Sequence, residues 1–276
     1  TILSPNQHGD WISMRNEGFK ELIPLAPDKK FAVNSHSMYS TYAIGIATNR
    51  DAWVYNFSKI HLNNNVSNMI SFYNKQVDEY EDAIIKNPKI KVEDFIDKDD
   101  TKISWTRGLR NRVVKKQAIA ADSEVVTSLY RPYCKQLLYF SNELIESMGL
   151  ALKLFPGGKE GNCLKNIGII LSGIGGAKPF SCLITENPTC MDIVEKGQIF
   201  PLYWYEESKT RQLSLFDENS QSEYIRHDGI SNWILNEVRT RLKLKSIDKE
   251  MIFYYIYGFL HSPEYRTMFE ADLKKS

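Results

Sequence analysis

The chain has 276 residues, of which 42% are hydrophobic, and it carries 35 basic and 34 acidic side chains for a formal net charge of +1. This length can bury a full core, in one large domain or in two modest ones. The near-neutral balance excludes a chain coated with positive charge for nucleic acid, but it allows a local basic face.

The first predicted elements are an irregular arm and a group of short strands. Residues 1–30 are interrupted by five glycines and prolines, which predicts an arm that lies over a surface. Residues 31–57 then predict two or three strands. In the last of these, Trp53, Tyr55 and Phe57 stand at every second position, the pattern of one face of a strand.

A polar turn, Thr48–Asp51, precedes these rings. Its guanidinium, amide and carboxylate groups allow two interpretations. Asn49 and Arg50 can read the hydrogen-bonding edge of a nucleobase, or the same groups can tie down the turn itself. Residue chemistry alone favours the second interpretation.

The clearest predicted helix follows over residues 59–86. Ser58 is placed as its N-cap, and Pro88 lies just beyond its end. Apolar side chains recur at steps of three or four, the spacing of one helical face; they are Leu62, Val66, Met69, Tyr73, Val77, Tyr80 and Ile84. Such a stripe predicts core scaffold.

The charge then reverses sharply along the chain. Residues 78–100 carry nine acidic and four basic side chains, whereas residues 101–121 carry no acid. The basic side chains of the second segment are Lys102, Arg107, Arg110, Arg112, Lys115 and Lys116. Trp105, Leu109 and Val113 stand four apart, so we expect a helix that these three anchor and that Ser104 caps.

Two interpretations of this basic segment remain open. Arg107, Arg110 and Lys115 fall away from the Trp105 side at about 100° per residue, so they can form a nucleic-acid-binding face. The alternative is a solvated helix that the preceding acidic run neutralises.

The rest of the chain predicts more strands and then helices. Arg131 before Pro132 should be extended within an aromatic-rich strand or corner, and residues 167–171, 180–185 and 200–205 predict strands, the last of them the final strand. Ser172 to Lys178 forms a glycine-rich turn with one lysine. Residues 206–227 predict a mobile linker. Three helices follow, capped by Asp228 or Ser231, by Asp248 and by Ser262.

These elements predict an α+β protein in two parts. A β-rich body with flanking helices covers residues 1–227, with the long helix near 59–86 and the linker near 206–227. A C-terminal helical cluster over residues 228–276 packs on that body.

No set of residues with a catalytic pattern stands out. Asn187–Cys190 lacks the second proline and the aromatic ring of an adenine-binding methyltransferase loop, and Gly173–Gly176 is not a P-loop. No GxGxxG opens a helix, and no Cys/His pattern indicates zinc. We therefore expect a binding module with no cofactor and no metal.

The cysteines and the apolar runs indicate a cytoplasmic protein without a membrane partner. The four cysteines form no CxxC pair, which is typical of reduced, buried thiols. No apolar run approaches the roughly 20 residues of a membrane helix, and no signal peptide is present. Thr1 rather than Met begins the chain, so we expect a piece of a longer protein.

A series of phrases runs in order over nearly all of the chain. They include Gly9-Asp10-Trp11, Gly45 with Thr48–Trp53 and Tyr55–Ser58, Phe72-Tyr73-Asn74, Ser104-Trp105, Tyr130-Arg131-Pro132, Ser172–Gly175 with Lys178-Pro179-Phe180, Phe200–Tyr205 and Gly258–Tyr265. Together they resemble the C-terminal target-recognition (specificity) domain of type ISP restriction–modification enzymes, which are single-chain helicase–methyltransferase–nuclease polypeptides.

This resemblance implies sequence-specific recognition of double-stranded DNA by a non-catalytic part of a larger chain. The parent would carry an endonuclease, an ATP-dependent helicase or translocase and an N6-adenine methyltransferase, whose domains would be the other partners. The basic segment would contact phosphates, with Asn49, Arg50, Ser172 and Lys178 as the next candidates for base reading. The rival function is a protein–protein docking module that braces neighbouring catalytic domains, and a truncated enzyme is a weaker third.

Overall fold

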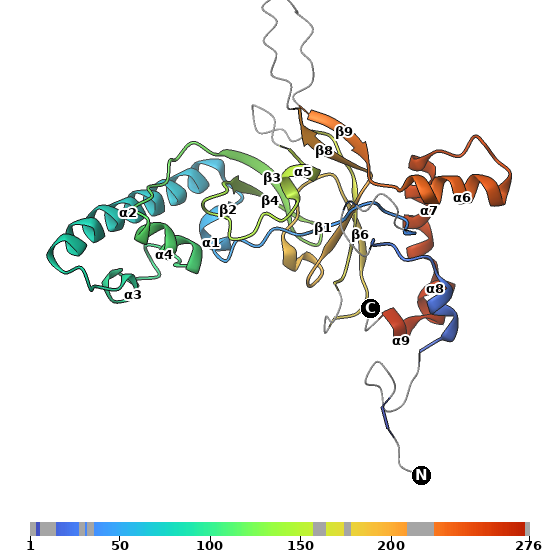
Figure 1. Cartoon of the computed structure of the whole chain (residues 1–276), viewed down its shortest axis with the longest axis horizontal. Coiled ribbons are helices and arrows are strands. Elements are labelled where there is room, and N and C mark those ends of the chain that lie inside the picture. The colour runs from blue at the N-terminus through green and yellow to red at the C-terminus, as the bar shows by residue number, and fades with distance from the viewer. Residues whose placement is uncertain are drawn as a thin grey trace, which may run out of the picture. The chain divides into compact units, whose positions relative to one another are not determined.

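The structure is a computed structural model that describes residues 4–5, 15–27, 31, 36–156, 164–173, 178–208 and 224–273. The chain forms two compact units, and Figure 1 shows their elements. Unit 1 comprises Thr1–Ile44, Asn166–Glu186 and Val194–Ser276, and unit 2 comprises Gly45–Lys165 and Asn187–Ile193. The boundaries between the compact units therefore differ from the predicted boundary between residues 227 and 228.

Unit 1 is built on two antiparallel sheets. The larger has the strand order β1-β7-β5-β6, with bounds Ala43–Ile44, Gln198–Pro201, Gly168–Leu171 and Cys182–Thr185. Every residue of β5 is buried, as its continuous apolar run predicted. The smaller sheet pairs β8 (Tyr203–Glu207) with β9 (Tyr224–Asp228). A 3-10 helix, Glu17–Glu21, precedes both sheets.

The linker predicted over residues 206–227 is wrong at both of its ends, because these ends are the paired strands β8 and β9. The strand predicted as the last one is consequently followed by another. Residues 209–223, the middle of the predicted linker, lie outside the described residues. Strand β9 has no apolar periodicity because its side chains are exposed or half-buried, and its pairing comes from backbone bonds and from the stacking of His227 on Trp204 at 4.1 Å.

Four helices complete unit 1 within its described part. They are α6 (Asn232–Leu242), α7 (Lys249–Leu260), α8 (Pro263–Met268) and α9 (Glu270–Leu273). The caps are confirmed: the side chains of Ser231, Asp248 and Ser262 each accept a backbone N–H of the first turn. The helices share one hydrophobic core with the sheet, in which Phe253 lies buried with Phe200.

Gly229 packs closely against the backbone of residues 201 and 202. Its N–H donates to the Leu202 carbonyl at 2.7 Å, and a Cβ at this position would lie 1.8 Å from the Pro201 carbonyl oxygen. We expect Gly229→Ala to lower the free energy of unfolding by about 2 kcal/mol, because the backbone must shift.

The matched control is Gly258→Ala. A Cβ there would meet no atom within 4 Å apart from its chain neighbours and the nearby backbone of α7 itself, so alanine should raise stability by up to about 1 kcal/mol. Urea denaturation of both variants measures the two effects. Equal stability of the two variants would show that the approach between Gly229 and Pro201 is looser than the structure has it.

Unit 2 contains the long helix and a three-stranded antiparallel sheet with the order β2-β4-β3. The strands are β2 (Tyr55–Asn56), β3 (Glu124–Arg131) and β4 (Cys134–Phe140). The predicted helix is confirmed as α2, Lys59–Lys86, with the Ser58 hydroxyl accepting from the His61 N–H. Its stripe is buried in the core of this unit with Leu109, Val113 and Leu138, except for Ile84, which is partly buried.

The remaining elements of unit 2 are short. They are α1 (Asp51–Val54), α3 (Val92–Phe95), α4 (Arg107–Val114), α5 (Ala151–Leu154) and a 3-10 turn at Met191–Ile193. Figure 1 shows α3 and α4 beside α2. None of the helices in the described part of the chain combines the length and apolarity needed to cross a bilayer.

The strand predicted over Trp53 to Phe57 is wrong in its first half. Asp51–Val54 is the helical turn α1, and only Tyr55 and Asn56 are extended. The Thr48 hydroxyl bonds the Asp51 carboxylate and accepts the Arg50 N–H, so local side-chain bonds start a helical turn before a strand can form. The rings do not share a face, because Tyr55 is buried and Phe57 is 73% exposed.

Candidate nucleic-acid interface

The basic segment does form a helix on the core of unit 2. Helix α4 begins at Arg107, and Leu109 and Val113 are buried beneath it. The predicted cap is wrong: Thr106, not Ser104, accepts the Leu109 N–H, while the Ser104 hydroxyl donates to the Asn49 carbonyl at 3.3 Å. Trp105 lies just before the helix, where its indole N–H donates to the Asp97 carbonyl at 2.7 Å.

Two of the six basic side chains are paired with acids. Lys102 Nζ lies 2.7 Å from Asp97 and 3.4 Å from Asp99, and Lys116 Nζ lies 2.9 Å from Glu81. The hydrogen bond from Lys102 holds the pKa of Asp97 below its usual value. For Lys102 and Lys116, the interpretation of a helix neutralised by the acidic run therefore applies.

A third basic side chain, Arg112, lies half-buried against the core. It interacts with Tyr73, whose hydroxyl donates to the Gln117 carbonyl at 2.9 Å. Burial raises the pKa of Tyr73 to about 12, and the nearby Arg112 guanidinium acts in the opposite direction. Arg112 therefore packs the helix onto α2.

The other three cations have no protein partner within the described part of the chain. Arg107 and Lys115 are exposed, and Arg110 is partly exposed. None of these three side chains makes a hydrogen bond or an ion pair with another described residue. They are the charges of α4 and its C-cap that remain for an outside partner.

Arg50 is committed to the inside of unit 2. Its side chain is 3% exposed, and its guanidinium donates to the Leu144 carbonyl and to the Thr106 hydroxyl, the latter at 2.7 Å. Burial lowers the pKa of Arg50 to about 10. In this arrangement Arg50 ties the turn to the cap of α4, the role that residue chemistry favoured.

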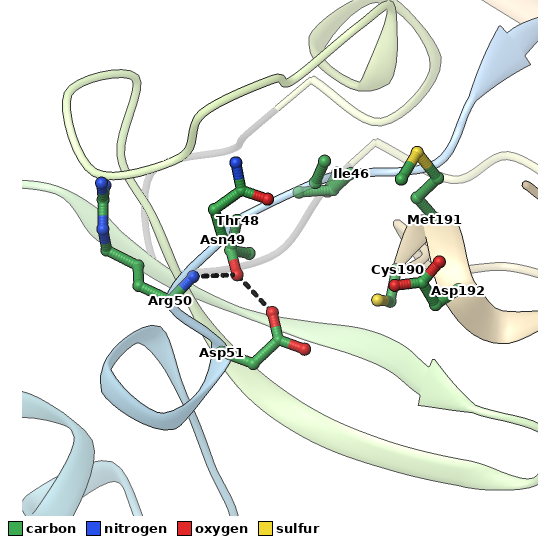
Figure 2. A pocket seen from close by; sticks show the side chains of 9 residues that line it. Ile46, Thr48, Asn49, Arg50, Asp51, Cys190, Met191 and Asp192 are labelled. Atoms are coloured by element: carbon green, nitrogen blue, oxygen red, sulfur yellow. Dashed lines mark hydrogen bonds between the residues drawn. The ribbon is translucent and has the colours of Figure 1, made fainter. Parts of the chain in front are cut away.

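Asn49 instead faces solvent at the edge of a small hollow. It is exposed and has a φ of 54°. The hollow has a volume of about 160 Å³ and is lined by Ile46–Asp51 and Cys190–Asp192. Figure 2 shows that the Arg50 side chain points away from Cys190, Met191 and Asp192. Asn49 is therefore the member of the predicted pair that can offer an amide to a base.

Ser172 and Lys178 belong to unit 1, with residues 174–177 between them outside the described part. The Ser172 hydroxyl accepts the Ser181 N–H at 2.7 Å. The Lys178 side chain is exposed, and its backbone N–H donates to the Glu195 carboxylate at 2.7 Å. Of these two residues, Lys178 has the side chain that is available to contact DNA.

Segment Asn187–Cys190 acts as scaffold for a neighbouring hairpin. The Pro188 carbonyl accepts both the Leu129 N–H and the Ser128 hydroxyl at 2.9 Å. This hairpin carries a feature that residue patterns missed, the half-exposed Arg131 beside Asp51. The phrase Tyr130-Arg131-Pro132 predicts only that Arg131 is extended, as it is at the end of β3, and gives no signal of the contact with Asp51. The described residues contain no cluster of His, Cys, Asp or Glu that could hold a metal ion.

A basic helix pinned to a core beside a polar turn defines a recognition module of mixed α+β architecture. The sequence profile named Type ISP C-terminal specificity domain matches residues 37–276. The chain belongs to this family of specificity domains.

Three solved structures are similar over the full fold. A nuclease-deletion mutant of the Type ISP restriction-modification enzyme LlaGI, in complex with a DNA substrate mimic, is 31% identical with a TM-score of 0.75 over 99% of this chain and 22% of its own. The ATP-dependent Type ISP enzyme LlaBIII bound to DNA is 29% identical with a TM-score of 0.77, over 99% and 16%. A DrdV–DNA complex is 26% identical with a TM-score of 0.80, over 100% and 25%.

These figures mean that the chain spans a quarter or less of the length of each of these proteins. No curated protein matches it.

Proposed function

We propose that this chain recognises a specific sequence in double-stranded DNA on behalf of a Type ISP restriction–modification enzyme. The observation that carries the proposal is a set of three cations, Arg107 and Arg110 on α4 and Lys115 at its C-cap, which have no acid partner among the described residues. Membership of a specificity-domain family supports it, as do the DNA complexes of the similar proteins.

The two kinds of side chain would divide the work. The α4 cations would set the register of the module on phosphates, and those contacts carry no sequence information by themselves. The Asn49 amide would read a base edge, since an Asn side chain can bond the N6 and N7 atoms of adenine together. Lys178 is a separate candidate on unit 1. Arg50 would act only by holding Asn49 and α4 in place.

The module itself would break and make no covalent bond. The helicase or translocase, the endonuclease and the N6-adenine methyltransferase would belong to other parts of a parent chain. By holding the site, this module would present one adenine to the methyltransferase. The rival function, a docking module that only braces neighbouring domains, is not favoured by the family match.

Selection from a random duplex pool tests the proposal. We expect the chain to enrich one sequence motif. The logarithm of its affinity for that motif should fall linearly with the logarithm of the salt concentration between about 50 and 200 mM salt. If the chain enriches a motif but its affinity for that motif does not change with salt, the α4 cations do not contact the DNA. A chain that enriches nothing and binds no duplex would refute the proposed function.

A further inference from the structure

The tip of the β3–β4 hairpin carries an aromatic ring in an unusual setting. The two strands pair from Glu124↔Phe140 to Arg131↔Cys134, which leaves Pro132 and Tyr133 as the tip. Tyr133 is 92% exposed, more than any other large hydrophobic side chain in the described part of the chain. Its φ is 61°, in the left-handed region.

Neither property helps the hairpin to fold. A turn that needs positive φ after a proline usually has Gly or Asn at that position. A bulky residue there is strained by about 1–2 kcal/mol, and such strain clusters at functional sites. A fully exposed phenol ring also buries no apolar surface. The free protein therefore gains nothing from a tyrosine at position 133.

Near its tip, the hairpin is also held along the outer edge of β3. The Leu129 N–H donates to the Pro188 carbonyl at 2.9 Å, and the Cys190 N–H donates to the Leu129 carbonyl at 3.2 Å. Below these bonds, the Tyr55 and Ser128 hydroxyls lie 3.1 Å apart in the core. The ring at the tip thus stands on a rigid support.

Arg131 precedes the tip by one residue and connects it to the neighbouring turn. The Arg131 guanidinium lies over the Tyr130 ring at 3.9 Å and 3.6 Å from the Asp51 carboxylate, and it donates to Cys190 Sγ at 3.2 Å. Its side chain is still 40% exposed. Asp51 and Cys190 both line the hollow at Asn49. The tip is therefore tied, through Arg131, to the turn proposed to read a base.

We propose that Tyr133 inserts into the base stack of the bound duplex, next to the base pairs that Asn49 reads, with Arg131 on the adjacent phosphate or base edge. This inference rests on the proposed function and specifies how the module deforms its DNA. Proteins that insert side chains between base steps lose base stacking and kink the duplex. An aromatic ring replaces part of the lost stacking, and the energy of unstacking is smallest where a base is already missing or mismatched.

Duplexes with a single abasic site test the insertion. The selected motif is prepared intact and in a series with one abasic nucleotide at each position, and binding is measured for the wild type, Tyr133→Gly and Tyr133→Phe. We expect the wild type to bind one abasic duplex about tenfold more tightly than the intact one. Tyr133→Gly should bind the intact duplex about tenfold more weakly and show no abasic gain, whereas Tyr133→Phe should keep both.

Two measurements separate this role from a structural one. Tyr133→Gly should unfold at the same urea concentration as the wild type or at a higher one, because glycine accepts the positive φ. Phe57→Ala removes another exposed ring of unit 2 and should bind like the wild type.

If the wild type binds DNA and Tyr133→Gly binds the intact duplex and every abasic duplex as tightly as the wild type does, the insertion is refuted while the proposed function stands. If the wild type binds no duplex, the proposed function fails and the insertion fails with it.

Discussion

Replacing Arg107, Arg110 and Lys115 together with alanine should weaken DNA binding several hundredfold at about 0.1 M salt. Each phosphate contact contributes about 0.9 to the slope of log affinity against log salt, so three lost contacts lower the slope by about 2.7. At about 0.1 M salt that slope corresponds to nearly three powers of ten in affinity. The loss should be the same for the selected motif and for scrambled duplexes, because phosphates carry no sequence information.

The matched control changes three other lysines of unit 2 to alanine, Lys86, Lys89 and Lys91, which are also exposed. This control changes the net charge by the same amount as the first variant, but its salt slope should stay within about half a unit of the wild-type slope. Circular dichroism checks that both variants are folded. Unchanged affinity in a folded α4 variant would show that this helix is a solvated face.

A different outcome would reassign one of the three cations. If a single alanine variant of Arg107 or Arg110 relaxes the preference at one base pair only, at a cost of about 1–3 kcal/mol, that arginine reads a guanine.

Arg50→Met should lower the free energy of unfolding by about 3 kcal/mol, because two buried acceptors then lose their charged donor. These acceptors are the Leu144 carbonyl and the Thr106 hydroxyl. Methionine keeps much of the side-chain volume, so the effect reports on the hydrogen bonds more than on a cavity. The urea midpoint should fall while the slope of unfolding against urea stays unchanged.

Asn49→Gly is the control for this prediction, because Asn49 is exposed and has a positive φ that glycine adopts without strain. Its stability should stay within about 0.5 kcal/mol of the wild type while its binding to the selected motif weakens. If Arg50→Met is as stable as the wild type, the buried guanidinium contributes no net stability.

Periodicity sustained over a whole helix made the scaffold predictable. The stripe of α2 repeats over seven positions, and the caps Ser58, Ser231, Asp248 and Ser262 act within their own first turns. Both signals depend on residues close in sequence, although the cap of α4 shows that a local signal can still fall on the wrong residue, Ser104 instead of Thr106. The strand predicted at residues 53–57 is wrong because five residues carry too little periodicity to outweigh the local bonds of Thr48.

The roles of the candidate site residues depended on distant partners. Arg50 was offered as a base reader, yet its acceptors lie 56 and 94 residues further along the chain. Strand β9 was hidden inside a polar stretch because its partner β8 lies on the far side of residues 209–223. Sequence spacing could identify Arg107, Arg110 and Lys115 as facing away from the core, but the acid partners of Lys102 and Lys116 required the folded structure to be seen.

One oxygen atom connects the two halves of the proposed interface. The Thr106 hydroxyl accepts the Leu109 N–H that begins α4 and, at the same time, the Arg50 guanidinium from the turn. Anyone who wishes to retarget this module by grafting a turn from a relative must therefore transfer residues 50 and 106 as a pair. A graft that changes only one of them would displace the helix as well as the turn. The altered sequence preference would then be accompanied by a lower affinity for every duplex.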